Sequence, residues 1–163
     1  ADAFPGGWRY VGALLDGLPY VDASVFRWAD RWWLFAEVER GGVHDTLHLF
    51  TSSDLLGPWQ EHPASPVVRG DSRAARPAGK PLLWEGKLYR FAQDCFPRYG
   101  AAVRAFEIRR LSSEEYEEVE AWPQAVLAAS GQGWNALGMH HLDLHRHDGR
   151  WLAFVDGRVD LLE

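Results

Sequence analysis

The sequence predicts an all-β protein built from repeated hairpin units, because one phrase occurs in it three times. Each copy is a hydrophobic run, a tight turn containing an acid, and an aromatic return run; the copies span residues 25–35, 82–91 and 142–154. The turn acids Asp30, Glu85 and Asp148 are 55 and 63 residues apart. An acid followed by Gly favours a two-residue hairpin, since such turns need positive φ. A repeat of roughly 50 residues made of short strands is typical of a β-propeller blade.

The three copies predict inner hairpins at about 20–38, 79–94 and 139–156. The stretches 47–59 and 102–116 each supply a third strand, a polar turn and an aromatic residue that opens a fourth strand. The N-terminal residues resemble the outer part of such a unit. We therefore expect residues 1–163 to form one propeller domain that begins late in one blade, completes two, and ends after the inner hairpin of another.

Helical signals are scarce. The segment 111–119 begins with Ser112 and Ser113 ahead of glutamates, a pattern that can cap one helical turn. The repeat explains the same segment more simply as a blade turn that leads into a strand. We expect one short helical turn there at most.

Composition narrows the function classes. The 163 residues are 47% hydrophobic and include nine Trp, which favours a folded, aromatic-rich protein. A net charge of −6 gives no electrostatic basis for nucleic-acid binding. The single cysteine, Cys95, excludes an internal disulfide. Because the sequence shows no signal peptide or membrane-spanning run, we expect no membrane insertion and a cytoplasmic location.

Candidate functional residues come directly before each inner hairpin, because the start of a propeller's innermost strand lines its central channel. These three places carry an acid at Asp22, an arginine pair at Arg73 and Arg76, and a histidine pair at His140 and His141. A purely structural repeat would place the same residue at all three. The divergent polar chemistry therefore indicates a site.

Each of these residues has two interpretations. Asp22 is either a general base or nucleophile facing the channel, or a turn residue that bonds its own backbone. Arg76 either holds a carboxylate or phosphate, or is a surface arginine in a polar loop. His140 and His141 suit substrate binding or proton transfer near neutral pH.

The end of the second hairpin offers a further candidate. Gln93-Asp94 closes it where Ala36-Glu37 and Val155-Asp156 close the others, so the recurring acid has a structural interpretation as well as a functional one. Asp94 precedes an aromatic and basic loop containing Arg98, which suits one wall of a sugar pocket. Cys95 is expected to be a small buried residue.

Two other groups of side chains have candidate roles, one in metal binding and one in stacking on a sugar. His141, Asp143, His145 and His147 alternate along one strand, but strand spacing sets neighbouring ligands ~7 Å apart, so we expect no cofactor and no resident metal, with an axial metal ion as the alternative. Most Trp residues are expected to pack between blades. Trp134 and the adjacent Asn135 lie in a Gly-rich loop, and Trp134 is the better candidate for stacking on a sugar ring.

Several segments resemble one family in order along the chain. They are Asp22-Ala23-Ser24, Arg76-Pro77-Ala78-Gly79, Gln93-Asp94-Cys95 and Met139-His140-His141-Leu142-Asp143. The chain thereby resembles the propeller domain at the N-terminus of glucosamine inositolphosphorylceramide transferases, which is similar to the five-bladed propeller of family 43 glycoside hydrolases. The resemblance implies a carbohydrate-related role and a partial five-bladed propeller, of which this chain is roughly the C-terminal three blades.

The resemblance also marks departures. The family usually has Asp-Pro-Ser where this chain has Asp22-Ala23-Ser24, and no carboxylate corresponds to the glycosidases' second acid at Arg76-Pro77. In the transferases, sugar transfer belongs to a separate C-terminal domain, so a fused or partner transferase domain is implied.

Two main functions remain open from the sequence. The first is glycan or glycolipid headgroup processing, with Asp22, Asp94 and His141 in catalytic roles and with Arg76, Arg98, Trp134, Asn135 and His140 binding substrate. The second is a non-catalytic module that binds a glycan or headgroup; a purely structural propeller is a third. Hydrolysis needs two carboxyl groups roughly 5–9 Å apart, so a lone Asp22 at the channel favours binding.

Overall fold

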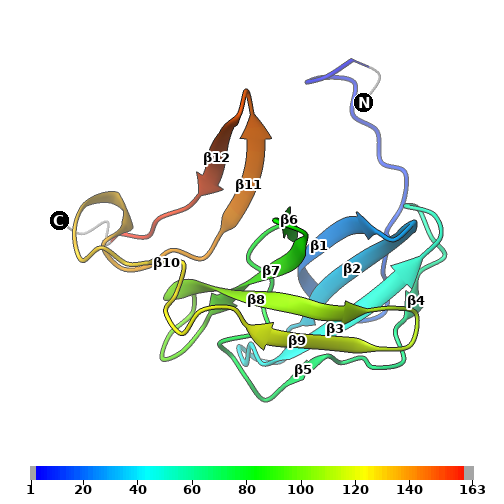
Figure 1. The fold of residues 1–163 in the computed structure, drawn as a ribbon, viewed down its shortest axis with the longest axis horizontal. Coiled ribbons are helices and arrows are strands. Elements are labelled where there is room, and N and C mark those ends of the chain that lie inside the picture. Colours follow the sequence, from blue (N-terminus) through cyan, green and yellow to red (C-terminus); the bar gives the residue numbers. More distant parts are fainter. Residues whose placement is uncertain (1–2, 160–163) are drawn as a thin grey trace.

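Antiparallel sheets make up the structure, a computed structural model that describes residues 3–159 (Figure 1). The first sheet has the order β1-β2-β3-β4, with β5 also paired to β3. Its strands are β1 (Tyr20–Trp28), β2 (Arg31–Val38), β3 (Thr46–Ser52), β4 (Gln60–Glu61) and β5 (Val68–Arg69). The first expected blade is therefore present as a four-stranded meander.

The second sheet repeats this arrangement. It has the order β10-β8-β7-β6, with β9 also paired to β8. Its strands are β6 (Leu82–Trp84), β7 (Lys87–Asp94), β8 (Ala102–Leu111), β9 (Tyr116–Glu120) and β10 (Leu127–Ala128). A third sheet is the hairpin of β11 (Leu142–His147) and β12 (Arg150–Val155), which stands apart from the other two in Figure 1.

The predicted hairpins are confirmed, turns included. Trp28 pairs with Arg31, Trp84 with Lys87 and His147 with Arg150. Both central residues of each turn have positive φ, from 47° at Ala29 to 76° at Gly86. These are the mirror-image turns whose twist matches that of paired strands.

The segment 111–119 continues from strand to strand, as the repeat predicts. Its serines form a turn in which the Ser112 hydroxyl accepts a hydrogen bond from the Glu115 amide at 3.0 Å. The single helical element of residues 3–159 is instead a 3₁₀ turn, Gly133–Asn135, in the Gly-rich loop. No helix in the described range is long or apolar enough to cross a membrane.

The main core lies between the first and second sheets. It joins Phe26, Trp33 and Phe35 of the first to Leu88 and Phe106 of the second, all less than one tenth exposed. A smaller core joins the second sheet to Leu142 of β11. Burial of sheet faces against their neighbours is the packing that a propeller requires.

The three units meet where their inner strands begin. The Ser24 hydroxyl of β1 donates to the carbonyl of Gly79 at 2.8 Å, and the Leu142 amide of β11 donates to the carbonyl of Ala78 at 2.7 Å. A Cβ on Gly79 would lie 2.2 Å from the Leu142 carbonyl oxygen, so only glycine fits there. The segments before β1, β6 and β11 thus converge on one axis.

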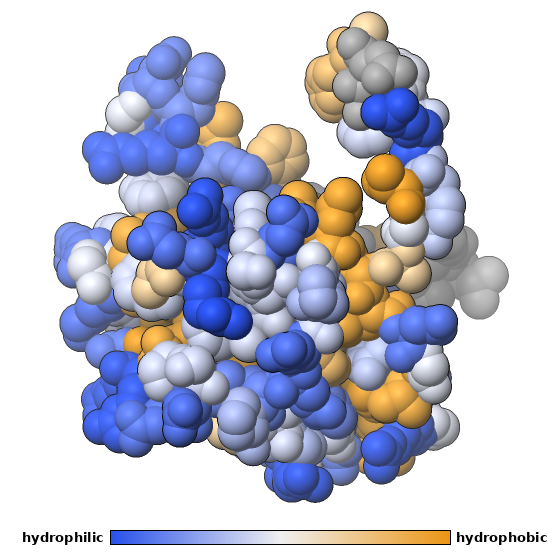
Figure 2. Space-filling model, turned by 90° about the vertical axis from the view of Figure 1, so that its right-hand side faces the viewer, coloured by the Kyte–Doolittle hydropathy of each residue, from blue (hydrophilic) through white to orange (hydrophobic). Residues whose placement is uncertain are grey.

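Both ends of the described chain expose large apolar side chains. Near the N-terminus Phe4 and Trp8 are 84% and 71% exposed, and in β12 Phe154 is 62% exposed. Every residue of β12 is exposed, whereas the equivalent strands β2 and β7 are mostly buried. Figure 2 shows apolar surface gathered in a band below two projecting parts of the molecule.

Candidate functional site

A β-bulge in β1 sets the position of Asp22. The pairing of β1 with β2 slips between Val21 and Ser24, and Asp22 in the slip has φ of 48°. A bulge re-aims a side chain that regular alternation would direct elsewhere. Here it turns the Asp22 carboxylate toward the axis, where the segments before β6 and β11 converge.

The carboxylate of Asp22 is held on one oxygen by two donors. Arg76 Nε and Gln93 Nε2 both donate to Asp22 Oδ2, each at 2.6 Å. Gln93 Nε2 also donates to the carbonyl of Pro77 at 2.9 Å. Since Nε2 faces two acceptors, the orientation of the Gln93 amide is unambiguous. The Asp22 side chain remains 39% exposed, so its other oxygen, Oδ1, is available to a ligand.

Behind Asp22 lies a second carboxylate that solvent does not reach. Glu37, at the end of β2, has no exposed surface; its Oε2 lies 3.3 Å from Arg76 and its Oε1 lies 3.0 Å from His44 Nδ1. Burial raises the pKa of Glu37, although His44 and Arg76 oppose the shift. Burial also lowers the pKa of Arg76, but the hydrogen bond and charge of Asp22 outweigh it and raise that pKa. Arg76 is therefore a permanent cation enclosed by two acids.

Tyr99 connects this cluster to the histidine pair. Its ring lies over the Arg76 guanidinium at 4.9 Å, and its centroid is 5.3 Å from that of His44 and 5.2 Å from that of His140. A Cβ on Gly100, which has φ of 66°, would lie 3.1 Å from the His140 Cβ, so a small residue must follow Tyr99. The ring fixes the spacing between units.

Asp156, which follows β12, orients the histidine pair. Its Oδ1 accepts hydrogen bonds from the backbone amides of His140 and His141 at 2.9 and 2.7 Å, and its Oδ2 contacts His140 Nδ1. The His140 ring is therefore fixed through one nitrogen and has the other available. His141 is exposed and lies beside it.

These groups surround an open pocket of about 350 Å³ at the convergence of the three units. We call it the Asp22 pocket; it is lined by Asp22, Ala23, Ser24, Pro77, Gly79, Gln93, His140 and His141. Of the predicted residues, Asp22, His140 and His141 line it. Arg76 lies behind Asp22 with its side chain 12% exposed.

Asp94 lies outside the Asp22 pocket. Its Oδ2 accepts a hydrogen bond from Arg104 at 2.7 Å and its Oδ1 accepts one from the Phe96 amide at 3.1 Å, so its carboxylate braces the loop that follows β7. We expected Asp94 to act with Asp22 and His141 in catalysis, but it does not line the pocket that those two residues share.

Hairpin register explains this error. Counted from the residue after each turn, Glu37, Gln93 and Asp156 occupy equivalent positions, and Asp94 comes one residue later. The acid therefore does not recur three times at one position. Sequence reasoning missed Gln93 as a site residue, although counting along the hairpins would have aligned it with Glu37. Nothing in the sequence signalled His44.

The other predicted binding residues lie away from Asp22. Arg98 donates to the carbonyl of Leu137 at 2.9 Å, and Asn135 bonds Ser130 at 2.6 Å and contacts the Met139 sulfur. Trp134 is 59% exposed beside Gly157. These three shape the loop before β11, and their sugar-binding roles stay predictions.

Two further kinds of site involve metal-ligating side chains and the thiol of Cys95. Within residues 3–159 no cluster of three or more His, Cys, Asp or Glu side chains has the geometry to hold a metal ion. Asp143 and His145 do share a face of β11, at 2.9 Å, as the alternation predicts. Cys95 is buried, and burial raises the pKa of its thiol, which keeps it protonated.

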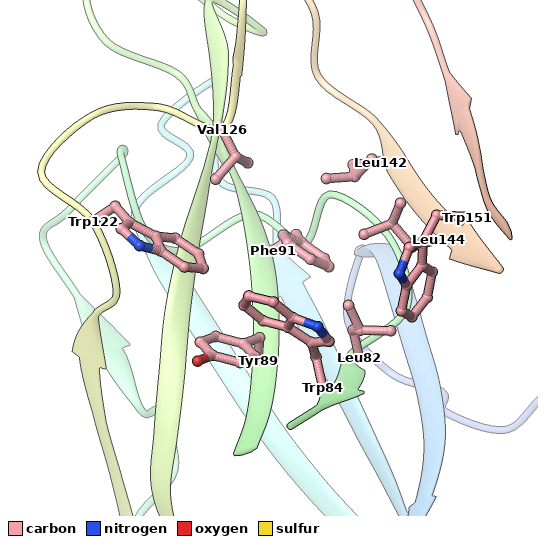
Figure 3. A pocket seen from close by; sticks show the side chains of 9 residues that line it. All are labelled: Leu82, Trp84, Tyr89, Phe91, Trp122, Val126, Leu142, Leu144 and Trp151. Carbon is pink, nitrogen blue, oxygen red and sulfur yellow. The ribbon is translucent and has the colours of Figure 1, made fainter. Parts of the chain in front are cut away.

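A second cavity, of about 270 Å³, opens between the second sheet and the β11–β12 hairpin (Figure 3). Its lining is almost entirely apolar: Leu82, Trp84, Tyr89, Phe91, Trp122, Val126, Leu142, Leu144 and Trp151. In Figure 3 the rings of Trp84, Tyr89 and Trp122 face the leucines of β11. Its polar groups are the Tyr89 hydroxyl and the indole nitrogens of Trp84, Trp122 and Trp151, and no charged side chain lines it.

Four-stranded units around a shared axis, with a polar pocket where the inner strands begin, define a partial β-propeller with an axial site. Residues 1–158 match the family model described as glucosamine inositolphosphorylceramide transferase 1, N-terminal, and the chain belongs to this family. The resemblance seen in the sequence is thereby confirmed.

Curated relatives support the family assignment, and a solved structure supports the fold. The chain is 37% identical to glucosamine inositolphosphorylceramide transferase 1 of Oryza sativa subsp. japonica and 35% identical to that of Arabidopsis thaliana. These alignments cover 96% and 94% of this chain but only 22% and 21% of the relatives, so the chain spans about a fifth of their length. A solved structure titled glycoside hydrolase aligns with a TM-score of 0.50 at 12% identity, covering 85% of this chain and 47% of that one. The predicted fold class, an all-β partial propeller of antiparallel meanders, is confirmed.

Proposed function

We propose that this domain binds the carbohydrate part of a glycan or glycolipid headgroup in the Asp22 pocket, and that the described residues do not hydrolyse it by themselves. The observation that carries the proposal is that Asp22 is the one carboxylate among the described residues that line the pocket. Glycoside hydrolysis uses two carboxyl groups roughly 5–9 Å apart across the scissile bond. Glu37 is enclosed behind Arg76, and Asp94 is paired with Arg104, so neither supports the role of second acid.

The family supports a role beside a transferase. The matched relatives are named glucosamine inositolphosphorylceramide transferase 1, and this chain corresponds to about a fifth of their length. We propose that residues 1–163 form a single β-propeller domain, the C-terminal part of a five-bladed ring, and that a transferase domain, fused or separate, carries out the sugar transfer. The propeller would hold the acceptor or donor sugar for that domain.

Blocking the pocket tests this function. Ala23 lines the Asp22 pocket and is exposed, so Ala23→Trp fills the space without altering any charge, and Ala23→Ser is the matched control. Binding of glucose, glucosamine and myo-inositol to the intact protein is measured by ligand-observed NMR. We expect binding that persists in Ala23→Ser and is lost in Ala23→Trp.

Two outcomes would overturn the proposal. One is wild-type protein that binds none of the three probes, or binds them equally well after Ala23→Trp. The other is release of free sugar from aryl glycosides by the wild-type protein, abolished by Asp22→Asn, which would favour the glycan-processing hypothesis with Asp22 as base.

A further inference from the structure

The geometry of the Asp22 pocket points to a class of ligand, an inference that rests on the proposed function. We propose that the pocket takes a hydrogen-bond-donating edge of a sugar, either two hydroxyls or a hydroxyl and an ammonium. We propose also that it rejects phosphate and other anions. The phosphate of a headgroup would then lie outside the pocket. Two unsatisfied acceptors and one enclosed arginine carry this inference.

The first acceptor is Asp22 Oδ1. Both donors that hold Asp22 reach Oδ2, and no described residue donates to Oδ1. A half-exposed carboxylate oxygen on a fixed side chain accepts strong, charge-assisted hydrogen bonds from hydroxyl or ammonium donors. The Arg76 and Gln93 bonds prevent Asp22 from turning to satisfy Oδ1 itself.

The second acceptor is Gln93 Oε1. Gln93 is 3% exposed, lines the pocket, and its Oε1 is buried without a hydrogen-bond donor among the described residues. Its Nε2 is occupied by Asp22 and Pro77, which fixes Oε1 on the opposite side of the amide. A buried acceptor without a partner is costly, and a ligand donor that reaches it recovers that cost. Asp22 Oδ1 and Gln93 Oε1 can therefore accept hydrogen bonds from two donor groups of one ligand.

Among the described residues that line the Asp22 pocket, none carries a permanent positive charge that could bind an anion. Arg76, the one permanent cation of the cluster, has Nε on Asp22, one terminal nitrogen facing Glu37, and its planar face under Tyr99. Against this single positive charge stand the carboxylates of Asp22, Glu37 and Asp156. Acids therefore outnumber permanent cations around the pocket, which favours a neutral or cationic donor over a phosphate. The carboxylates that Arg76 holds are those of Asp22 and Glu37 within the protein.

Substitution of Asp22 by asparagine exchanges one acceptor for a donor. In Asp22→Asn the amide oxygen remains facing Arg76 and Gln93, so the new NH₂ group takes the place of Oδ1. Asn also tolerates the positive φ found there. The matched control is Asp30→Asn, which removes one acid at an exposed turn position with φ of 60°.

The test measures dissociation constants of the intact protein for glucosamine, glucose, myo-inositol and inorganic phosphate. Wild type and Asp30→Asn are expected to bind at least one sugar or polyol and to bind phosphate at least about tenfold more weakly. Asp22→Asn and Gln93→Met should each weaken sugar binding about tenfold, the loss of one hydrogen bond to a buried or charged group. Stronger binding of glucosamine than of glucose would assign the ammonium edge; equal binding would assign hydroxyls.

Results that overturn this inference differ from those that overturn the function. Phosphate binding as tight as sugar binding, or sugar binding unchanged in both Asp22→Asn and Gln93→Met, would refute the ligand class even if Ala23→Trp still abolishes binding. A melting curve of each variant shows whether weaker binding comes from a loss of thermal stability.

Discussion

Arg90 is the residue whose removal should most damage the framework that holds the site. It lies in β7, is 2% exposed, and donates through Nε and Nη2 to the two oxygens of Glu118, both at 2.5 Å. Its Nη1 donates at 2.7 Å to the carbonyl of Ala74, two residues before Arg76. The guanidinium also lies 4.5 Å from the Phe106 ring. One buried side chain thus anchors the loop that delivers Arg76 to Asp22.

The structure gives the magnitude. Arg90→Met leaves Glu118, whose side chain is only 12% exposed, without its cation and leaves the Ala74 carbonyl without a donor. Removal of one partner of a buried ion pair costs about 3–5 kcal/mol. With a urea m-value of about 2 kcal/mol per M, a loss of about 4 kcal/mol lowers the unfolding midpoint by about 2 M.

Two companion variants make the urea experiment decisive. Lys87→Met breaks an ion pair on the same strand, with Glu107 at 3.2 Å, but Lys87 is 55% exposed and its loss should cost about 0–1 kcal/mol. The double variant Arg90→Met/Glu118→Leu removes both buried charges and should recover most of the loss. An Arg90→Met protein no less stable than Lys87→Met would refute the reasoning.

Three further predictions concern the axis, the buried acid and the exposed ends. Gly79→Ala should destabilise the fold by about 2–4 kcal/mol because its Cβ has no room, whereas Gly86→Ala, with open space but a turn φ of 76°, should cost about 1 kcal/mol; equal urea midpoints would contradict this. Glu37 has a raised pKa, so its stabilising effect is complete below 4.5, the usual value for a glutamate, and is lost as pH rises through the folded pKa. Wild type should therefore lose stability relative to Glu37→Gln as the pH rises above 4.5, and parallel profiles would count against it. The exposed Trp151 and Phe154 should cause concentration-dependent association in sedimentation velocity, reduced by Phe154→Ser; a monomer at all concentrations would be inconsistent.

Local physics made the hairpins predictable. Each tight turn is encoded by two or three residues, and each strand by its own hydrophobic pattern, so the three repeats could be placed within a few residues of the observed strands. The divergence of residues ahead of each inner strand likewise identified Asp22, His140 and His141.

Long-range register was not predictable in the same way. The partners of Asp22 come from loops and strand ends 54 and 71 residues away, and a one-residue shift decides whether Gln93 or Asp94 reaches it. That shift follows from hairpin pairing and from a bulge in β1, which no local pattern announces. His44 joins the site only because the loop after β2 folds back against Arg76, and Tyr99 only because its ring bridges two units.

The most direct test of the central claim is a crystal structure of the intact protein soaked with glucosamine. We predict density for the sugar in the Asp22 pocket, with one donor about 3 Å from Asp22 Oδ1 and another about 3 Å from Gln93 Oε1. Sugar density elsewhere, an empty pocket at saturating ligand, or a sugar seated there without a donor on either oxygen would contradict it.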